Sequence, residues 1–126
     1  MILIDSSGWI EYFSNGPLAS IYAKYVAQPA QVIIPTIVCY EVYKKIKMEK
    51  GESIAISIAA TLQKGNIVPL TDELAMMAAD YSLQYKISMA DAIVYATALQ
   101  ERVSLVTSDR DLKELPGVIY HEKTER

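Results

Sequence analysis

Four acidic residues occupy positions from which their carboxylates can meet at one edge of a folded sheet. Asp5 directly follows the apolar run MILI, and Asp109 directly follows VSLVTS. If these runs are parallel strands, both acids project into the crevice beyond the strand ends, where open parallel sheets bind their ligands. Asp91 stands in the first turn of an apolar helix, and Glu41 lies one turn into the helix that follows VIIPT. Periodicity alone leaves the direction of Glu41 ambiguous.

Asp91 is the only charged residue in the segment SMADAIVYATALQ, residues 88–100. Ser88 and Asp91 are spaced like a helix-capping pair, and the helix dipole favours a carboxylate in the first turn. Capping alone does not account for the rest of the segment, because apolar residues cover every side of this helix and predict that it is buried nearly all round. A carboxylate at the entrance to an apolar core needs a partner of opposite charge.

Converging carboxylates imply a bound cation, since two like charges about 4 Å apart repel by about 4 kcal/mol at an effective dielectric of about 20. Oxygen ligands without histidine or cysteine favour Mg²⁺ or Mn²⁺ over zinc. An ion held in this way can supply a nucleophilic water and stabilise negative charge on a phosphoryl oxygen. The residues by themselves therefore predict metal-dependent phosphate chemistry.

The elements that must position these acids follow an alternating pattern. Short β-rich runs alternate with longer helical patterns, which predicts an α/β fold with a parallel sheet covered by helices. Thr36 is the expected cap of a helix that Gly51 terminates, and Ser88 opens the last long helix. No linker or repeat divides residues 1–126, so we expect a single domain. The expected strands cover residues 1–4, 31–35, 66–70, 103–108 and 117–121, and the helices before Ser88 cover 6–13, 18–27, 36–50, 53–64 and 72–86.

Composition places the chain among ordinary globular proteins. Its 126 residues are 52% hydrophobic and 21% charged, enough for a real core. The single cysteine, Cys39, excludes an intramolecular disulfide and suits a reducing compartment. No targeting segment or membrane-spanning run is visible, so we expect a cytoplasmic protein without membrane contact.

The net charge of −3 gives no overall attraction to a polyanion, so such a partner would need a local basic patch. Lysines at 44, 45, 47 and 50 are candidates for that patch. The alternative is that they form a solvated helix end that complements the helix dipole.

Four blocks of sequence resemble the PIN-domain ribonucleases, especially the VapC toxins of toxin–antitoxin modules. The blocks stand in the family's order and span nearly the whole chain: ILIDSSGWIEYF (2–13), IIPTIVCYEV (33–42), SMADAIVYATAL (88–99) and LVTSDRDL (105–112). The resemblance implies a three-layer α/β/α fold around a mostly parallel sheet of four to five strands.

The same resemblance assigns an acidic, metal-binding active site to Asp5, Glu41, Asp91 and Asp109, with Ser6 and Thr107 as hydroxyl residues beside it. It implies an endoribonuclease that uses Mg²⁺ or Mn²⁺ to activate water, a VapB-type antitoxin that blocks the acidic groove, and a homodimer. Because the chain is acidic overall, we expect weak affinity for free RNA.

Some assignments near these motifs have alternatives. Asp109 is preferred to Asp111 as the fourth acid, because it lies nearer the strand end and matches the motif position of the family that the sequence resembles. Asp111 is interpreted as a turn or helix-cap acid. Glu11 matches a frequent acidic position of the family but is expected to be an exposed helix residue. The pair Trp9 and Phe13, four residues apart, is interpreted as core packing rather than as a platform for bases.

Other functions fit parts of the pattern. A phospho-acceptor receiver domain has a similar alternation, but it requires paired acids after the first strand and a lysine after the fifth. A PIN fold without activity, serving as a binding scaffold, keeps the fold and loses the chemistry. A nuclease acting on DNA shares every site residue, because the acids do not contact the 2′-hydroxyl that distinguishes RNA.

Overall fold

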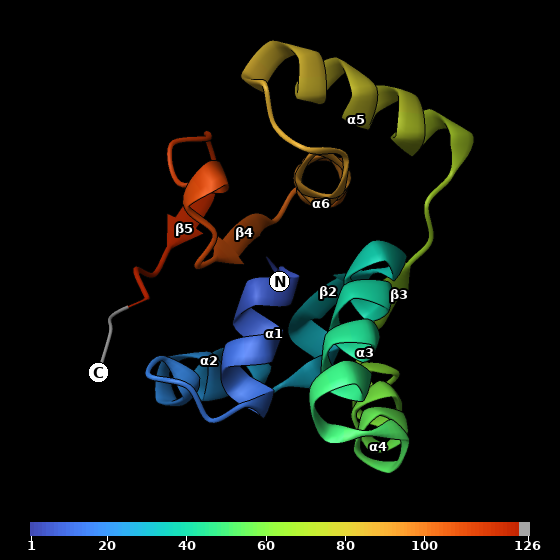
Figure 1. Cartoon of the computed structure of the whole chain (residues 1–126). Helices are drawn as coiled ribbons and strands as arrows, with labels where there is room; N and C mark the ends of the chain where they lie inside the picture. The colour runs from blue at the N-terminus through green and yellow to red at the C-terminus, as the bar shows by residue number, and fades with distance from the viewer. Residues whose placement is uncertain (124–126) are drawn as a thin grey trace.

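A five-stranded parallel sheet lies at the centre of the computed structural model, which describes residues 1–123 (Figure 1). The strand order is β3-β2-β1-β4-β5, and all four neighbouring pairs are parallel. The expected α/β class and the five strands are thereby confirmed. The strands are β1 (Ile2–Ile4), β2 (Val32–Pro35), β3 (Asn66–Val68), β4 (Ser104–Thr107) and β5 (Val118–Tyr120).

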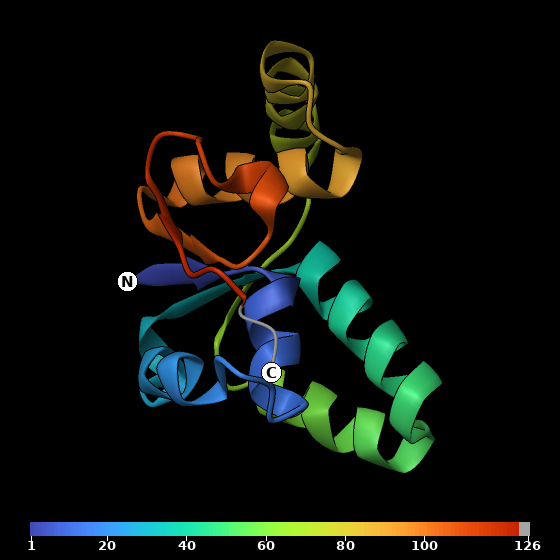
Figure 2. The same cartoon turned by 60° about the vertical axis from the view of Figure 1, so that its left-hand side comes forward.

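Helices cover both faces of this sheet and give the three-layer arrangement. Helices α1 and α2 lie on one face, while α6 lies on the other with α5 outside it (Figure 2). Helices α3 and α4 pack against each other and extend away from the sheet. The helices are α1 (Ser6–Phe13), α2 (Ala19–Val26), α3 (Thr36–Lys50), α4 (Glu52–Leu62), α5 (Asp72–Tyr85) and α6 (Met89–Glu101), with short 3₁₀ turns η1 (Pro29–Gln31) and η2 (Arg110–Leu112).

Most boundaries lie within two residues of the predicted ones, but the cap of α3 differs. Thr36 is the first residue of α3 rather than its cap, and Pro35 takes the cap position in an extended conformation without a side-chain hydrogen bond. The extended backbone of Pro35 belongs to β2, so the chain passes from strand to helix without a loop. Residues 37–41 are consequently fixed directly at the end of β2.

Helix α6 is buried on all sides, as its sequence predicts. Residues 92–98 are all buried. One side packs on the sheet, and the other is covered by α5 through Leu74 and Ala78. Tyr81 and Tyr95 meet edge-to-face with ring centroids 5.4 Å apart. This burial places the start of α6, where Asp91 lies, at the boundary between core and solvent.

The order of the strands creates a switch point beside β1. The chain moves from β1 to β2 and then β3 on one side, and later returns to β4 on the other side of β1. Helices that leave neighbouring strands in opposite directions open a crevice at the carboxyl ends of those strands. By this rule the crevice of this sheet is expected beyond Ile4 and Thr107, where Asp5 and Asp109 follow, and this region is called the crevice below. Among residues 1–123, no helix has the length and apolar character needed to cross a membrane.

Candidate active site

Asp5 is the buried anchor of the crevice, with 4% of its surface exposed. Its Oδ1 accepts hydrogen bonds from the Ser7 hydroxyl at 2.6 Å and from the Gly8 amide at 3.4 Å, so Asp5 also caps α1. Its Oδ2 accepts a hydrogen bond from Thr107 Oγ1 at 2.8 Å. Hydroxyl groups from α1 and from the end of β4 therefore fix the carboxylate of Asp5 in one orientation.

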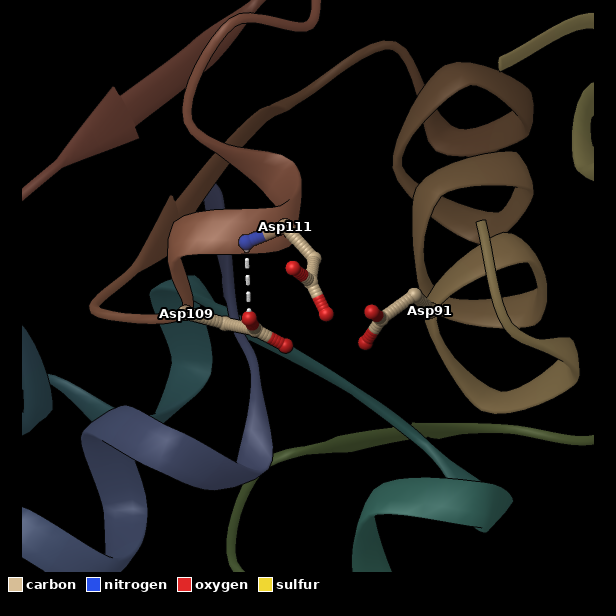
Figure 3. Close-up of side chains that lie close together, drawn as sticks. All are labelled: Asp91, Asp109 and Asp111. Carbon is tan, nitrogen blue, oxygen red and sulfur yellow. Dashed lines mark hydrogen bonds between the residues drawn. The ribbon is translucent and has the colours of Figure 1, made fainter. Parts of the chain in front are cut away.

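Asp91, Asp109 and Asp111 bring their carboxylates together from two elements (Figure 3). One oxygen of each lies within 4.8 Å of the others. The hydroxyl of Ser88 caps α6 by accepting a hydrogen bond from the Asp91 amide at 3.3 Å. The side chain of Asp91 points across toward η2 (Figure 3). The opening serine thus caps the helix, and the aspartate faces other acids.

The turn η2 holds the other two acids of this group. Asp109 caps the turn, because its Oδ1 accepts a hydrogen bond from the Asp111 amide at 2.9 Å. The Asp109 amide in turn donates to Thr107 Oγ1 at 2.9 Å. Thr107 therefore contacts both Asp5 and Asp109. Both acids lie beside Asp91, and Asp109 raises the pKa of Asp91 more than Asp111 does.

Glu41 lies at one side of this group, on the second turn of α3, and is half-buried. Burial is the main cause of its raised pKa, the nearby Ser6 hydroxyl lowers that pKa, and the charge of Asp109 raises it further. Glu41 also lines a surface groove together with Ser6, Lys44 and Lys45. The direction that periodicity left ambiguous is therefore toward the crevice.

Two acids of the crevice have raised pKa values, so their ionised forms are disfavoured. Burial, with a smaller contribution from Asp109, raises the pKa of Asp5 to about 6 despite three hydrogen bonds that favour its ionised form. Burial and then the charge of Asp109 raise the pKa of Asp91 to about 7. Carboxylates with such pKa values are typical of functional sites, and a cation between them would restore their charge.

This geometry coincides with a match to a known family over most of the chain. The family model of the PIN domain matches residues 2–118. The chain belongs to the PIN domain family.

Several solved structures share the fold of this PIN domain. A chain of a toxin–antitoxin complex from Klebsiella pneumoniae has 28% identity and a TM-score of 0.82, and the match covers 97% of this chain and 99% of that one. A VapC toxin of Mycobacterium tuberculosis that cleaves the sarcin–ricin loop has 18% identity and a TM-score of 0.75, with 90% and 93% covered.

A chain of the DNA-bound VapBC complex from Salmonella typhimurium has 13% identity and a TM-score of 0.77, with 98% of this chain and 100% of that one covered. No curated protein matches the sequence. The predicted resemblance to PIN domains of the VapC type is thereby confirmed at the level of family and fold, and the receiver-domain alternative is excluded.

The donor atoms of this PIN domain suit a hard divalent cation. The grouped ligands are carboxylate oxygens from Asp91, Asp109 and Asp111, and the Asp5 carboxylate is close enough for its charge to raise the pKa of Asp91. Magnesium and manganese prefer such oxygen ligands. The residues present therefore fit the Mg²⁺ or Mn²⁺ ion that the sequence predicts.

Metal binding by this PIN domain should strengthen as the pH rises through the interval in which Asp5 and Asp91 lose their protons. A cation must displace those protons, so each contributes up to about a tenfold gain in affinity per pH unit. We expect calorimetric titration with Mn²⁺ to show tighter binding at about pH 7.5 than at about pH 5.5. Affinity that is constant over this interval would contradict the assignment.

The metal-free protein should show the opposite trend in stability. The folded state retains protons that the unfolded chain releases above a pH of about 4. The free energy of unfolding should therefore fall as the pH rises from about 4 to about 7. Thermal melting in EDTA measures this trend.

The prediction that Glu11 is an exposed helix residue is wrong. Only 5% of it is exposed. Its Oε1 accepts a hydrogen bond from the Leu18 amide at 3.0 Å, and its Oε2 pairs with Lys123 at 3.4 Å. The loop after α1 folds back over this carboxylate, and helix periodicity cannot show that. Glu11 therefore orders the loop between α1 and α2 and lies outside the group of metal-site candidates.

The aromatic pair on α1 packs as predicted. Trp9 is buried, and its ring stacks on Phe13 with centroids 5.7 Å apart. This pair therefore does not form a platform for bases. The only histidine, His121, bonds the Tyr25 hydroxyl at 2.8 Å.

Ser7 is a site residue that sequence reasoning missed. The expected hydroxyl residues are Ser6 and Thr107, yet Ser7 makes the shortest hydrogen bond to Asp5 and also accepts one from the Ser108 amide at 3.0 Å. The available signal is the run Asp-Ser-Ser at a strand end, in which an aspartate that caps a helix lies next to hydroxyls of the first turn.

Proposed function

We propose that this PIN domain is a metal-dependent endoribonuclease, the toxin of a type II toxin–antitoxin module. Asp5, Glu41, Asp91 and Asp109 are the proposed catalytic and metal-binding residues, with Asp111 added because it lies within 4.8 Å of Asp91 and Asp109. The observation that carries the proposal is the grouping of Asp91, Asp109 and Asp111, with Asp5 close enough for its charge to act on Asp91, in a chain of this family.

The proposed role of each residue follows from its burial and its hydrogen bonds. In this proposal Asp91 and Asp109, which are partly exposed, hold Mg²⁺ or Mn²⁺. Ser7 and Thr107 hold Asp5 so that its carboxylate faces the same space. A divalent cation, when bound, supplies a nucleophilic water and neutralises charge at the scissile phosphate. Glu41, which is half-buried beside Ser6, is proposed to accept a proton from the attacking water.

The proposed partners are drawn from the family and its neighbours. The matched chains from Klebsiella and Salmonella belong to toxin–antitoxin complexes. These matches support a VapB-type antitoxin as the protein partner. The resemblance to VapC toxins adds an RNA substrate and a homodimer to the proposal. The proposal also includes a cytoplasmic location and a single domain over residues 1–126.

The test uses the purified full chain, freed of any antitoxin, on total cellular RNA and on single-stranded DNA. Reactions contain Mg²⁺, Mn²⁺ or EDTA, and fragment ends are sequenced. We expect discrete RNA cuts that require the metal. Cuts in DNA alone would make the protein a deoxyribonuclease, and no cuts by folded, metal-bound protein would favour a binding scaffold.

A further inference from the structure

A groove of about 380 Å³ lies on the surface between the start of α1 and one side of α3. It combines apolar, aromatic and basic side chains with two residues of the acidic site. The lining residues are Ser6, Ile10, Tyr40, Glu41, Lys44, Lys45 and Met48.

The groove shares residues with the acidic site. Glu41, one of the proposed site residues, lines the groove. Ser6, the residue after Asp5, lines the same groove from α1. A chain-like ligand that leaves the crevice past Glu41 therefore enters this groove.

Two lysines give the groove a positive side next to an acidic centre. Lys44 and Lys45 are both exposed. Within residues 1–123, Lys44 forms no ion pair, and its Nζ lies 3.2 Å from the Tyr40 hydroxyl and 5.4 Å from the centre of that ring. Lys45 pairs with Glu49 at 2.9 Å, an exposed contact of the kind that contributes little to stability and can be exchanged for a phosphate.

The other two lysines of α3 point elsewhere. Lys47 lies 3.4 Å from Glu52 and over the ring of Tyr43, and Lys50 donates to the Phe13 carbonyl at 3.5 Å. Neither lines the groove. The structure thus divides the lysine run, which the sequence presents as one patch, into a groove pair and an outer pair.

Tyr40 adds a platform for stacking. It is 58% exposed although it is a large aromatic residue, and it lies in the groove beside Lys44. Aromatic rings on a positively charged track are the common means of binding single-stranded nucleic acid, because bases stack on the rings while phosphates contact the cations.

We infer that this groove binds the RNA strand that runs out of the acidic site, with phosphates on Lys44 and Lys45 and an unpaired base on Tyr40. The inference rests on the proposed function and deepens it by assigning a substrate-binding surface and a preference for single strands. It also reconciles a net charge of −3 with a polyanionic substrate, since Lys44 and Lys45 provide local attraction beside the site.

The experiment compares two double variants that remove the same charge from the same helix. Lys44→Ala with Lys45→Ala alters the groove, and Lys47→Ala with Lys50→Ala is the matched control. Binding of a short fluorescein-labelled single-stranded RNA of mixed sequence is measured by anisotropy in Ca²⁺ over a range of salt concentrations. Each lost phosphate contact should reduce the slope of log affinity against log salt by about 0.7.

For the groove variant we expect affinity about tenfold or more weaker and a slope reduced by about 1.4, with the slope of the control unchanged. Tyr40→Leu should weaken binding about fivefold or more without changing the slope, because stacking carries no charge. Equal effects of the two double variants would overturn the inference, since overall charge alone would then explain them. Undiminished binding by the groove variant would also overturn it and leave the groove to a protein partner.

Failure of the proposed function gives a different result. If the wild-type protein cuts no RNA, the proposed function fails before the variants are compared. If it cuts RNA and the groove variant binds and cuts equally well, only the inference fails.

Discussion

Asp91→Asn is expected to lower the metal-dependent cleavage rate by about a thousandfold while leaving the fold intact, because metal ligation supplies several kcal/mol of transition-state stabilisation. An amide binds Mg²⁺ more weakly than a carboxylate and keeps nearly the same size. The hydrogen bond that caps α6 uses the Asp91 amide and the Ser88 hydroxyl, so the substitution does not remove it. The measurement is the rate of RNA cleavage in Mg²⁺, with circular dichroism to check the fold.

The same substitution should stabilise the protein in EDTA. Burial and the Asp109 charge raise the pKa of Asp91 to about 7, so its ionisation opposes folding near neutral pH. A neutral side chain removes that penalty, and we expect a higher Tm for the variant in EDTA than for the wild type. Asp80→Asn, an equal change of charge at an exposed position of α5, is the control and should alter neither property. Wild-type cleavage by the Asp91 variant would refute the site.

Gly8→Ala is expected to destabilise the protein by about 2–3 kcal/mol, at the upper end of the range for overpacking. A methyl group on Gly8 would overlap the ring of Tyr22 and approach Ile4 Cγ2 to 2.7 Å. Both neighbours are fully buried and cannot move aside into solvent. The gain of about 1 kcal/mol that alanine brings to an exposed helix position is therefore outweighed. Urea denaturation monitored by circular dichroism measures the loss.

A double variant separates overpacking from other causes. Tyr22→Leu removes the ring atoms nearest to the added methyl group. If the clash causes the loss, Gly8→Ala should cost much less in the Tyr22→Leu background, a coupling that a double-mutant cycle measures. Equal losses in both backgrounds would place the cause elsewhere, for example in the Gly8 amide that bonds to Asp5.

The meeting of Asp5 with Asp109 is accessible from the sequence, because both acids directly follow strands and parallel strands end at one edge. Placing Asp91 needs only the added inference that its helix packs on that sheet. The sequence offers Asp109 and Asp111 as alternatives, but it does not show that both lie beside Asp91, since that depends on the way in which Asp109 caps a single 3₁₀ turn. The prediction for Glu11 is wrong because a local pattern cannot show a loop that returns over a helix.

The surroundings of the lysines of α3 could not be predicted from the sequence either. Their spacing gives a run of positive charge but not the side on which each lysine meets a neighbour. Packing of α3 between α1 and α4 decides that, because Glu52 of α4 pairs with Lys47 and Ser6 of α1 faces the groove. A sequence can therefore name the charges, while only tertiary packing divides them between surfaces.

The acids of the site come from distant parts of the chain, with Asp5 after β1, Glu41 in α3, and Asp91, Asp109 and Asp111 in or beside α6 and η2. An ion shared among them would act as a reversible cross-link that closes a loop of nearly the whole polypeptide, the case in which loop closure removes most entropy from the unfolded chain. Because such an ion binds the folded state alone, its free concentration enters the folding equilibrium. The divalent-ion concentration would then set the resistance of the protein to proteolysis as well as its rate of cleavage.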